Sequence, residues 1–250
     1  MKDLVTTNTE NQSMKNRILY MDDDIAVLNK LPGEICELWT KESHEEKKYY
    51  LPDILLQYLH ENNAGKESCQ CFNRLDRPVS GAVLLVFNTA LISVLQNQFT
   101  AAQKERKSLK KTYRLIVEGI IPKMNDYELL KHFIRFDGSK QKAFVYDEEK
   151  RKTKEARLLW RSLGHGDRYS FIEAELLTGR THQIRAQLAH IGLHVKGDVK
   201  YGARRQDTLP GIRLHSAKLC FVHPLTGNTV EIDAPLLHID SLWQAFLSCF

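Results

Sequence analysis

The segment that most constrains the fold is the apolar run 82–87 (AVLLVF), which follows the charged turn 73–81 (NRLDRPVSG). A continuous apolar run bounded by turn residues is typical of a strand buried on both faces of a sheet. Asp76 therefore lies on a short loop attached to the core, with Arg74 and Arg77 on either side of it in the sequence. Flanking guanidinium groups favour the charged form of a carboxylate, so this turn is a candidate site; a surface turn stabilised by ion pairs is the alternative.

Composition limits the class of protein. Of the 250 residues, 42% are hydrophobic and 27% are charged, as is typical of a globular protein. No apolar run approaches the ~20 residues of a membrane span, and residues 1–17 lack the apolar stretch of a secretory signal. We therefore expect a cytoplasmic protein with no membrane partner. The five cysteines are an odd number without zinc-ribbon or redox-pair spacing, so we expect free thiols.

Hydrophobic periodicity predicts both helices and strands. We expect a single α+β domain over residues 18–250, with a mixed, largely antiparallel sheet flanked by helices, after a disordered or weakly ordered arm at 1–17. Three aspartates at 22–24 form a turn without the spacing of a calcium loop, and residues 123–140 show no clear pattern. The expected strands are 18–20, 25–28, 82–87, 111–119, 143–146, 156–160, 169–176, 214–222 and 229–233, and the expected helices are 51–60, 91–99, 181–191 and 241–250.

The net charge of +5 is modest, but the cations are grouped. Three basic clusters separated by apolar segments suit a polyanion such as RNA, and solvated helix ends or loops are the alternative for each cluster. The clusters are Lys104, Arg106, Lys107, Lys110, Lys111 and Arg114; then Lys150, Arg151, Lys152, Lys154 and Arg157; and finally Lys196, Lys200, Arg204, Arg205 and Arg213.

The helix expected near residue 181 carries cations at its unfavourable end. Arg180, His182 and Arg185 lie at or near its N-terminus. Each cation there costs about 0.3–1 kcal/mol through the helix dipole, which indicates that the segment faces an anion, either a carboxylate or a phosphate. The buried face of the helix is expected to consist of Ile184, Leu188 and Ile191, with Gly192 ending it.

A zinc site formed by His182, His190 and His194 is an alternative for the same segment. His190 and His194 are four residues apart, as in helical metal pairs. However, Gly192 lies between them, and no acidic residue follows His190. We therefore expect no metal here.

Several of these motifs occur together in RluA-type pseudouridine synthases, and the sequence resembles that family from about residue 18 to residue 235. Any one motif is moderately specific, whereas the ordered set is highly specific. The matching segments are Ile18-Leu-Tyr20, Asn29-Lys30, Arg74-Leu-Asp-Arg77, Ser80-Gly81, Lys111-Thr-Tyr113, Val117-Glu-Gly119, Gly179-Arg-Thr-His-Gln-Ile-Arg185, Leu188-Ala-His-Ile-Gly192, Gly197-Asp198, Tyr201-Gly202, Leu214-His215 and His223-Pro-Leu-Thr-Gly227.

The resemblance implies an isomerase that converts specific uridines of ribosomal or transfer RNA into pseudouridine. It implies that Asp76 is the catalytic nucleophile or glycosidic-bond catalyst, that Arg185 pairs with it, and that Tyr113 stacks on the base and helps remove the proton from C5. Arg74 is expected to hold the flipped-out nucleotide and its phosphate. The other expected substrate contacts are Arg77, Arg180, His182 and Leu214.

The chemistry of this resemblance requires no metal or organic cofactor. An ionised carboxylate, a cation that fixes it and a hydroxyl near the base suffice for a reaction without redox change. The base must leave the RNA stack, so we expect structured RNA to bind through basic loops. A monomer without a separate N-terminal RNA-binding domain is expected. The chain departs from the family pattern at Asn73, where histidine is usual.

Two other classes of function compete with this one. A non-catalytic RNA-binding or RNA-folding protein would retain the same fold; Asn73 favours it, whereas Asp76, Tyr113 and Arg185 argue against it. A hydrolase with paired carboxylates would need a second acid close to Asp76, and the adjacent motifs offer none.

Overall fold

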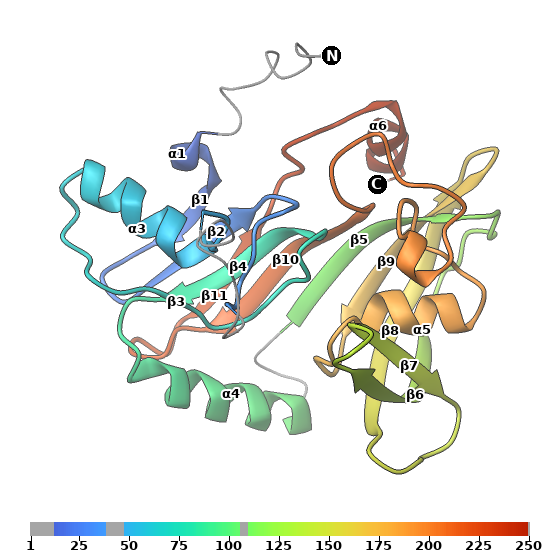
Figure 1. Cartoon of the computed structure of the whole chain (residues 1–250), viewed down its shortest axis with the longest axis horizontal. Coiled ribbons are helices and arrows are strands. Elements are labelled where there is room, and N and C mark those ends of the chain that lie inside the picture. Colours follow the sequence, from blue (N-terminus) through green and yellow to red (C-terminus); the bar gives the residue numbers. More distant parts are fainter. Residues whose placement is uncertain (1–12, 39–47, 106–109, 250) are drawn as a thin grey trace.

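In the computed structural model, residues 13–38, 48–105 and 110–249 are described (Figure 1). The strands are β1 (Ile18–Met21), β2 (Ile25–Lys30), β3 (Gln70–Cys71), β4 (Ser80–Val86), β5 (Lys110–Glu118), β6 (Glu128–Asp137), β7 (Lys142–Tyr146), β8 (Lys154–His165), β9 (Tyr169–Leu176), β10 (Leu214–Val222) and β11 (Thr229–Asp233). The helices are α1 (Met14–Arg17), α3 (Leu51–Glu61), α4 (Leu91–Glu105), α5 (Gln183–His190), the 3₁₀ turn η1 (Val199–Tyr201) and α6 (Ser241–Leu247).

The described strands form one sheet. Its order is β1-β2-β4-β10-β5-β9-β8-β6-β7, with β3 paired to β4 and β11 paired to β10. Among these pairs only β4 and β10 are parallel. The expected α+β fold with a mixed, largely antiparallel sheet is therefore confirmed.

The strand predicted to be buried on both faces is β4. Val83 and Leu85 belong to the apolar cluster on one face of the sheet. Leu84 belongs to the cluster on the opposite face. All three side chains are completely buried, so this prediction is confirmed.

Helices cover both faces of the sheet. Leu55 of α3 and Leu188 of α5 belong to the same buried apolar cluster as Leu85, whereas Leu95 of α4 belongs to the cluster of Leu84 on the other face. Helix α6 packs against β5, β8 and β9 in a third cluster. Figure 1 shows α3 and α4 beside the β1–β4 part of the sheet, and α5 beside β6, β7 and β8. None of the described helices combines the length and apolar character required to cross a membrane.

The parallel contact between β4 and β10 depends on a glycine. Ser80 and Gly81 lie opposite His215 and Ser216. Gly81 has φ +113°, and a Cβ atom at this position would lie 2.3 Å from the carbonyl oxygen of Ser216. Because only glycine combines this backbone angle with so close an approach, Gly81 fixes the end of the 73–81 loop against β10.

Two predicted features differ from the structure. Strand β6 occupies most of residues 123–140, and its buried positions include His132 as well as Ile134. A histidine in a core-facing position hides the alternation on which a strand prediction depends. Ile191 is 38% exposed rather than buried, because α5 ends at His190.

The end of the arm expected at residues 1–17 is ordered. Met14–Arg17 forms the short helix α1, and Arg17 is 4% exposed. Its guanidinium donates to both carboxylate oxygens of Glu34 at 2.6 and 2.7 Å. Residues 1–12 of the expected arm lie outside the described residues.

Candidate active site

The loop that carries Asp76 is held in place by a buried lysine. The Nζ atom of Lys30 donates to the backbone carbonyls of Val79 at 2.7 Å, Arg77 at 3.2 Å and Asp76 at 3.3 Å. Burial lowers the pKa of Lys30 to about 8, so it is still mostly protonated at neutral pH. The last residue of β2 therefore organises the backbone around the candidate nucleophile.

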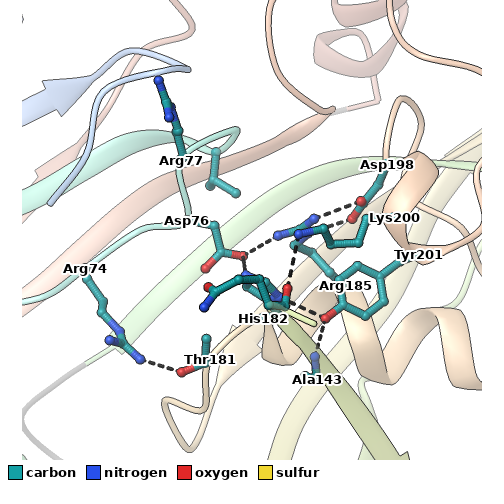
Figure 2. A network of polar contacts seen from close by, with 12 residues as sticks. Arg74, Asp76, Arg77, Ala143, Thr181, His182, Arg185, Asp198, Lys200 and Tyr201 are labelled. Atoms are coloured by element: carbon teal, nitrogen blue, oxygen red, sulfur yellow. Dashed lines mark hydrogen bonds and ion pairs between the residues drawn. The ribbon is translucent and has the colours of Figure 1, made fainter. Parts of the chain in front are cut away.

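Arg185 connects Asp76 to a second carboxylate (Figure 2). Its Nη1 atom lies 2.8 Å from Oδ2 of Asp76. Its Nε and Nη2 atoms donate to the two oxygens of Asp198 at 2.6 and 2.8 Å. Burial opposes the charge on Arg185, but the hydrogen bonds to Asp198 and the charge of Asp76 outweigh it and raise the pKa of Arg185. The expected Asp76–Arg185 pair is present in the structure.

The flanking arginines do not contact the Asp76 carboxylate, contrary to the expectation from sequence. Arg74 donates to Glu37 at 2.6 Å and to the hydroxyl of Thr181. The Nε atom of Arg77 donates to the carbonyl of Gly33 at 3.2 Å. Both side chains point away from the carboxylate (Figure 2). Neighbours in a tight loop diverge, so the cation that neutralises Asp76 comes from a distant helix.

A chain of hydrogen bonds sets the tautomer of His182. The backbone N–H of Ala143 donates to the Tyr201 hydroxyl at 2.7 Å, and this hydroxyl lies 2.9 Å from Nδ1 of His182. The hydroxyl can then donate its own hydrogen to Nδ1. The Nε2 atom lies 3.8 Å from Oδ2 of Asp76, and a hydrogen there avoids placing two lone pairs against each other, so we assign the imidazole hydrogen to Nε2. Burial lowers the pKa of His182 to about 4, with help from the charge of Arg185, so the ring is neutral at neutral pH.

Backbone geometry also marks His182 as a special position. It precedes the first residue of α5 with φ +57° and ψ +23°, a left-handed conformation that is uncommon outside glycine. Such a conformation costs about 1–3 kcal/mol and is concentrated at functional sites. Helix α5 begins at Gln183 rather than at Thr181, and Arg185 is thereby placed in its first turn.

A cavity of 590 Å³ opens beside Asp76, and Tyr113 lies in its wall. Tyr113 is 5% exposed, and burial raises its pKa well above that of an ordinary tyrosine. A hydrogen bond with Ser216 opposes this increase, and the charge of Asp76 adds to it. The side chain is therefore a neutral phenol at neutral pH.

The same cavity contains most of the expected substrate contacts. Arg74, Arg180, His182 and Leu214 line it, whereas Arg77 does not. Arg180 is anchored through a 2.8 Å hydrogen bond from its Nε atom to a backbone carbonyl. The structure therefore brings four of the five residues together around Asp76 and Tyr113.

Asn73, where the family usually has histidine, supports the sheet. Its Oδ1 atom accepts a 2.7 Å hydrogen bond from the backbone N–H of Leu84, and the residue is 8% exposed. The site therefore tolerates asparagine because its side chain satisfies a buried donor of β4.

The third basic cluster is only partly available to a polyanion. Lys196 is hydrogen-bonded to Asp207, which also accepts from Arg213 at 2.8 Å. Arg213 is 2% exposed and makes a further ion pair with Asp240 at 2.5 Å. These two cations stabilise the fold, whereas Lys200 of the same cluster is exposed. Arg106 and Lys107 of the first cluster lie outside the described residues.

The histidines of the zinc alternative do not converge. Nδ1 of His182 contacts the Tyr201 hydroxyl, and Nδ1 of His194 contacts the Tyr201 carbonyl at 2.7 Å. His190 instead lies 2.8 Å from Oδ1 of Asp147. The structure thus gives His190 an acidic partner that sequence reasoning missed, from the turn after β7.

Within the described chain, His132, Asp147 and His190 form a group with metal-ligand chemistry at the C-terminal end of α5. The Nε2 atom of Gln187 lies 3.0 Å from Nδ1 of His132, and 3.3 and 3.4 Å from two backbone carbonyls. It must therefore donate to Nδ1, which leaves the hydrogen of His132 on Nε2. A protonated Nε2 has no lone pair for a metal, so we assign no ion to this group.

Sequence reasoning missed three members of the site. Asp198 and Tyr201 hold Arg185 and His182, and Lys111 lines the cavity of Tyr113. Burial lowers the pKa of Lys111 to about 8. All three lie within motifs that the family shares, and this could have marked them as functional. Their contacts depend on tertiary structure, so the sequence alone did not reveal them.

Comparisons with known proteins point to one class of enzyme. A human protein described as RNA pseudouridylate synthase domain containing 4 superimposes with a TM-score of 0.68 and 19% identity, over 96% of this chain and 94% of that one. An uncharacterized RNA pseudouridine synthase of Mycoplasma genitalium is 29% identical over 232 residues, 92% of this chain and 70% of the relative. A tRNA pseudouridine synthase C of Vibrio cholerae is 26% identical over 253 residues, 93% of this chain and 95% of the relative.

The family model for RNA pseudouridylate synthases matches residues 24–190. This match covers more than half of the chain, so the protein belongs to the RNA pseudouridylate synthase family. The resemblance to RluA-type enzymes is confirmed, and the protein is an RNA pseudouridine synthase, an isomerase.

Proposed function

We propose that the protein isomerises specific uridines in structured ribosomal or transfer RNA, with Asp76 as the nucleophile. The observation that carries this proposal is the arrangement of the Asp76 carboxylate. Both of its side-chain contacts with described residues, Arg185 at 2.8 Å and His182 at 3.8 Å, involve Oδ2. The side chain is 21% exposed, beside the cavity that Tyr113 lines. This arrangement supports attack by Oδ1 on a bound nucleotide.

The reaction needs no electron transfer. The bond between N1 of uracil and C1′ of ribose breaks, the uracil turns, and a bond between C5 and C1′ forms. The C5 hydrogen leaves as a proton, and N1 gains a proton. Arg185 keeps one oxygen of Asp76 occupied and directs the other toward the substrate, and neutral His182 adds an N–H near the same oxygen.

Tyr113 is proposed to contact the base and to take part in removal of the C5 proton. Because it is a neutral phenol in the free protein, it must pass on its own hydroxyl proton if it accepts one from C5. The hydrogen bond with Ser216 lowers the pKa of Tyr113 and so eases the loss of that proton. We propose Arg74, Arg180, His182 and Leu214 as contacts to the flipped-out nucleotide, because they line the same cavity.

Two kinds of RNA are supported as substrates by the relatives. One relative is named a tRNA pseudouridine synthase C. Another, from Buchnera aphidicola, is named a ribosomal large subunit pseudouridine synthase C and is 28% identical over 90% of this chain.

The hydrolase alternative is disfavoured by the position of Asp198. Both oxygens of this carboxylate are occupied by Arg185, and its side chain is 2% exposed. A buried carboxylate engaged in this way cannot activate water beside a substrate. Asp198 is therefore not available as the second acid that a paired-carboxylate hydrolase requires.

Tritium release tests the proposed function. Total transfer RNA and ribosomal RNA, labelled at C5 of uridine and taken from a strain that lacks this gene, are incubated with the purified protein. We expect release of tritium from at least one pool, because C5 loses its hydrogen on isomerisation. Tight binding of RNA with no release from either pool would favour the RNA-binding alternative.

A further inference from the structure

A second cavity adjoins the one that Tyr113 lines. It has a volume of 610 Å³, within the ~300–1,000 Å³ typical of small-molecule sites. Both cavities are lined by Asp76, Arg185 and the hydrogen-bonded pair Arg74 and Thr181. Tyr113 lies only in the first cavity. The reacting carboxylate therefore stands at the boundary between two spaces, of which the isomerised nucleotide needs one.

The second cavity has an aromatic wall and a cationic rim. Phe136, from the end of β6, lines it with a half-buried ring that meets His182 edge to face, with centroids 5.5 Å apart. Lys200, from η1, is exposed and donates to the carbonyl of Gln141 at 3.1 Å. Arg77 also lines this cavity and not the first. An aromatic ring beside cations suits a base and its phosphate.

We propose that this second cavity binds the nucleotide adjacent to the target uridine, with its base against Phe136 and its phosphate at Lys200. The inference rests on the proposed function, since it requires that the first cavity holds a uridine of the same strand. Two cavities with a shared wall suit two consecutive nucleotides. The second cavity would then select the sequence context of the target, and it accounts for the location of Arg77.

The test measures coupling between a protein side chain and one position of the RNA. The probe is a single-stranded nine-nucleotide RNA with one central uridine, and two further probes have an abasic residue on the 5′ or the 3′ side of that uridine. Affinity is measured by fluorescence anisotropy for the wild type, for Phe136→Ala and for Phe144→Ala. Phe144 is the matched control, because it lies on the same β6–β7 hairpin and outside the cavity.

For the wild type and Phe144→Ala, we expect the abasic residue on one side of the uridine to weaken binding about fivefold or more. For Phe136→Ala, the same abasic residue should change affinity by less than twofold, because the stacking partner is already missing. An equal loss in all three proteins, on one side of the uridine or on both, would overturn the inference, as would no loss in the wild type.

If Phe136→Ala does not fold, a second test uses the variant Lys200→Gln and an RNA that carries a methylphosphonate. Lys200→Gln changes an exposed side chain, so its effect on stability should be small. We expect it to remove the loss of affinity that a neutral methylphosphonate beside the central uridine causes in the wild type. Additive losses would contradict the assigned phosphate contact.

The two hypotheses fail in different ways. If the proposed function is wrong, the wild-type protein releases no tritium. If only the role of the second cavity is wrong, tritium is released but the coupling between the side chain and the RNA position is missing.

Discussion

At the scale of single residues, the site depends on how Arg185 is held. It makes one hydrogen bond to Asp76 and two to Asp198, and the Tyr201 ring lies against it with its centroid 4.9 Å from the guanidinium carbon. A guanidinium fixed on three sides presents Asp76 in one orientation. Asp198 and Tyr201 are therefore positioning residues rather than groups that touch the substrate.

Asp198→Asn should reduce kcat by about 10–100-fold while changing KM for RNA less than threefold. The amide keeps the shape of the carboxylate but turns one acceptor into a donor, so Arg185 loses one of its two bonds to this residue. Steady-state tritium release measures the effect, and Asp147→Asn, on an exposed carboxylate, is the matched control. A variant with unchanged kcat would show that Arg185 does not need this support.

Tyr201→Phe should lower kcat about tenfold with little change in KM. Without the hydroxyl, Nδ1 of His182 loses its donor, and the hydrogen is no longer confined to the nitrogen that faces Asp76. Initial rates measured over a range of RNA concentrations at several pH values give kcat and KM separately, with Tyr146→Phe on the neighbouring strand β7 as control. Equal losses in the two variants would contradict a role for the tautomer.

The sequence predicted the central residues of the site but not the residues that hold them in position. Asp76, Tyr113 and Arg185 were accessible because each occupies a distinctive motif. Arg77 flanks Asp76 in the sequence, but adjacent side chains in the loop diverge and this arginine lines the second cavity, so its contact with substrate stays a prediction. The hydrogen bonds that Arg185 donates to Asp198 join residues 13 positions apart across a loop. No local sequence pattern indicates such a contact.

At the scale of elements, the register of β4 and β10 sets the distance between the Asp76 loop and the cavity wall. Gly81 lies opposite Ser216, and Ser216 in turn is hydrogen-bonded to Tyr113. The strands themselves were predicted from apolar runs and alternation. Their parallel pairing was not, because it joins segments more than 130 residues apart and leaves no local signal.

Gly81→Ala should lower the free energy of unfolding by about 3 kcal/mol. The new methyl group would collide with the backbone of Ser216 at a φ that alanine rarely adopts. Urea denaturation measures the loss. Gly138→Ala is the control, because a Cβ atom there meets no atom within 4 Å and φ is not positive. Similar stabilities of the two variants would show that β4 and β10 are less closely packed.

At the scale of the whole molecule, two buried histidines connect folding to pH. Burial lowers the pKa of both His182 and His215 from 6.5 to about 4. His215 is 1% exposed and bridges β4 to the chain after β11, through Ser80 at 2.8 Å and the carbonyl of Ala234 at 2.9 Å. Both rings must therefore be neutral in the native state.

The protein should lose stability as pH falls from about 6.5 toward 4. Below the unfolded-state pKa, these histidines are protonated in the unfolded chain but stay neutral in the folded protein, so acid favours unfolding. By about pH 5, each histidine should lower the free energy of unfolding by roughly 2 kcal/mol, at 1.36 kcal/mol per pKa unit. Urea titrations at about pH 7 and about pH 5 measure the difference. Stability that stays constant or rises over this interval would contradict the burial of neutral imidazoles.

The most direct measurement of the central claim compares Asp76→Asn with the wild type in the tritium-release assay, with RNA affinity measured on the same samples. The substitution keeps the size of the side chain and removes the carboxylate that we propose as the nucleophile, which lies 2.8 Å from Arg185. We expect release to fall below detection while the affinity for RNA changes less than threefold. Substantial turnover by Asp76→Asn would show that another group attacks the uridine.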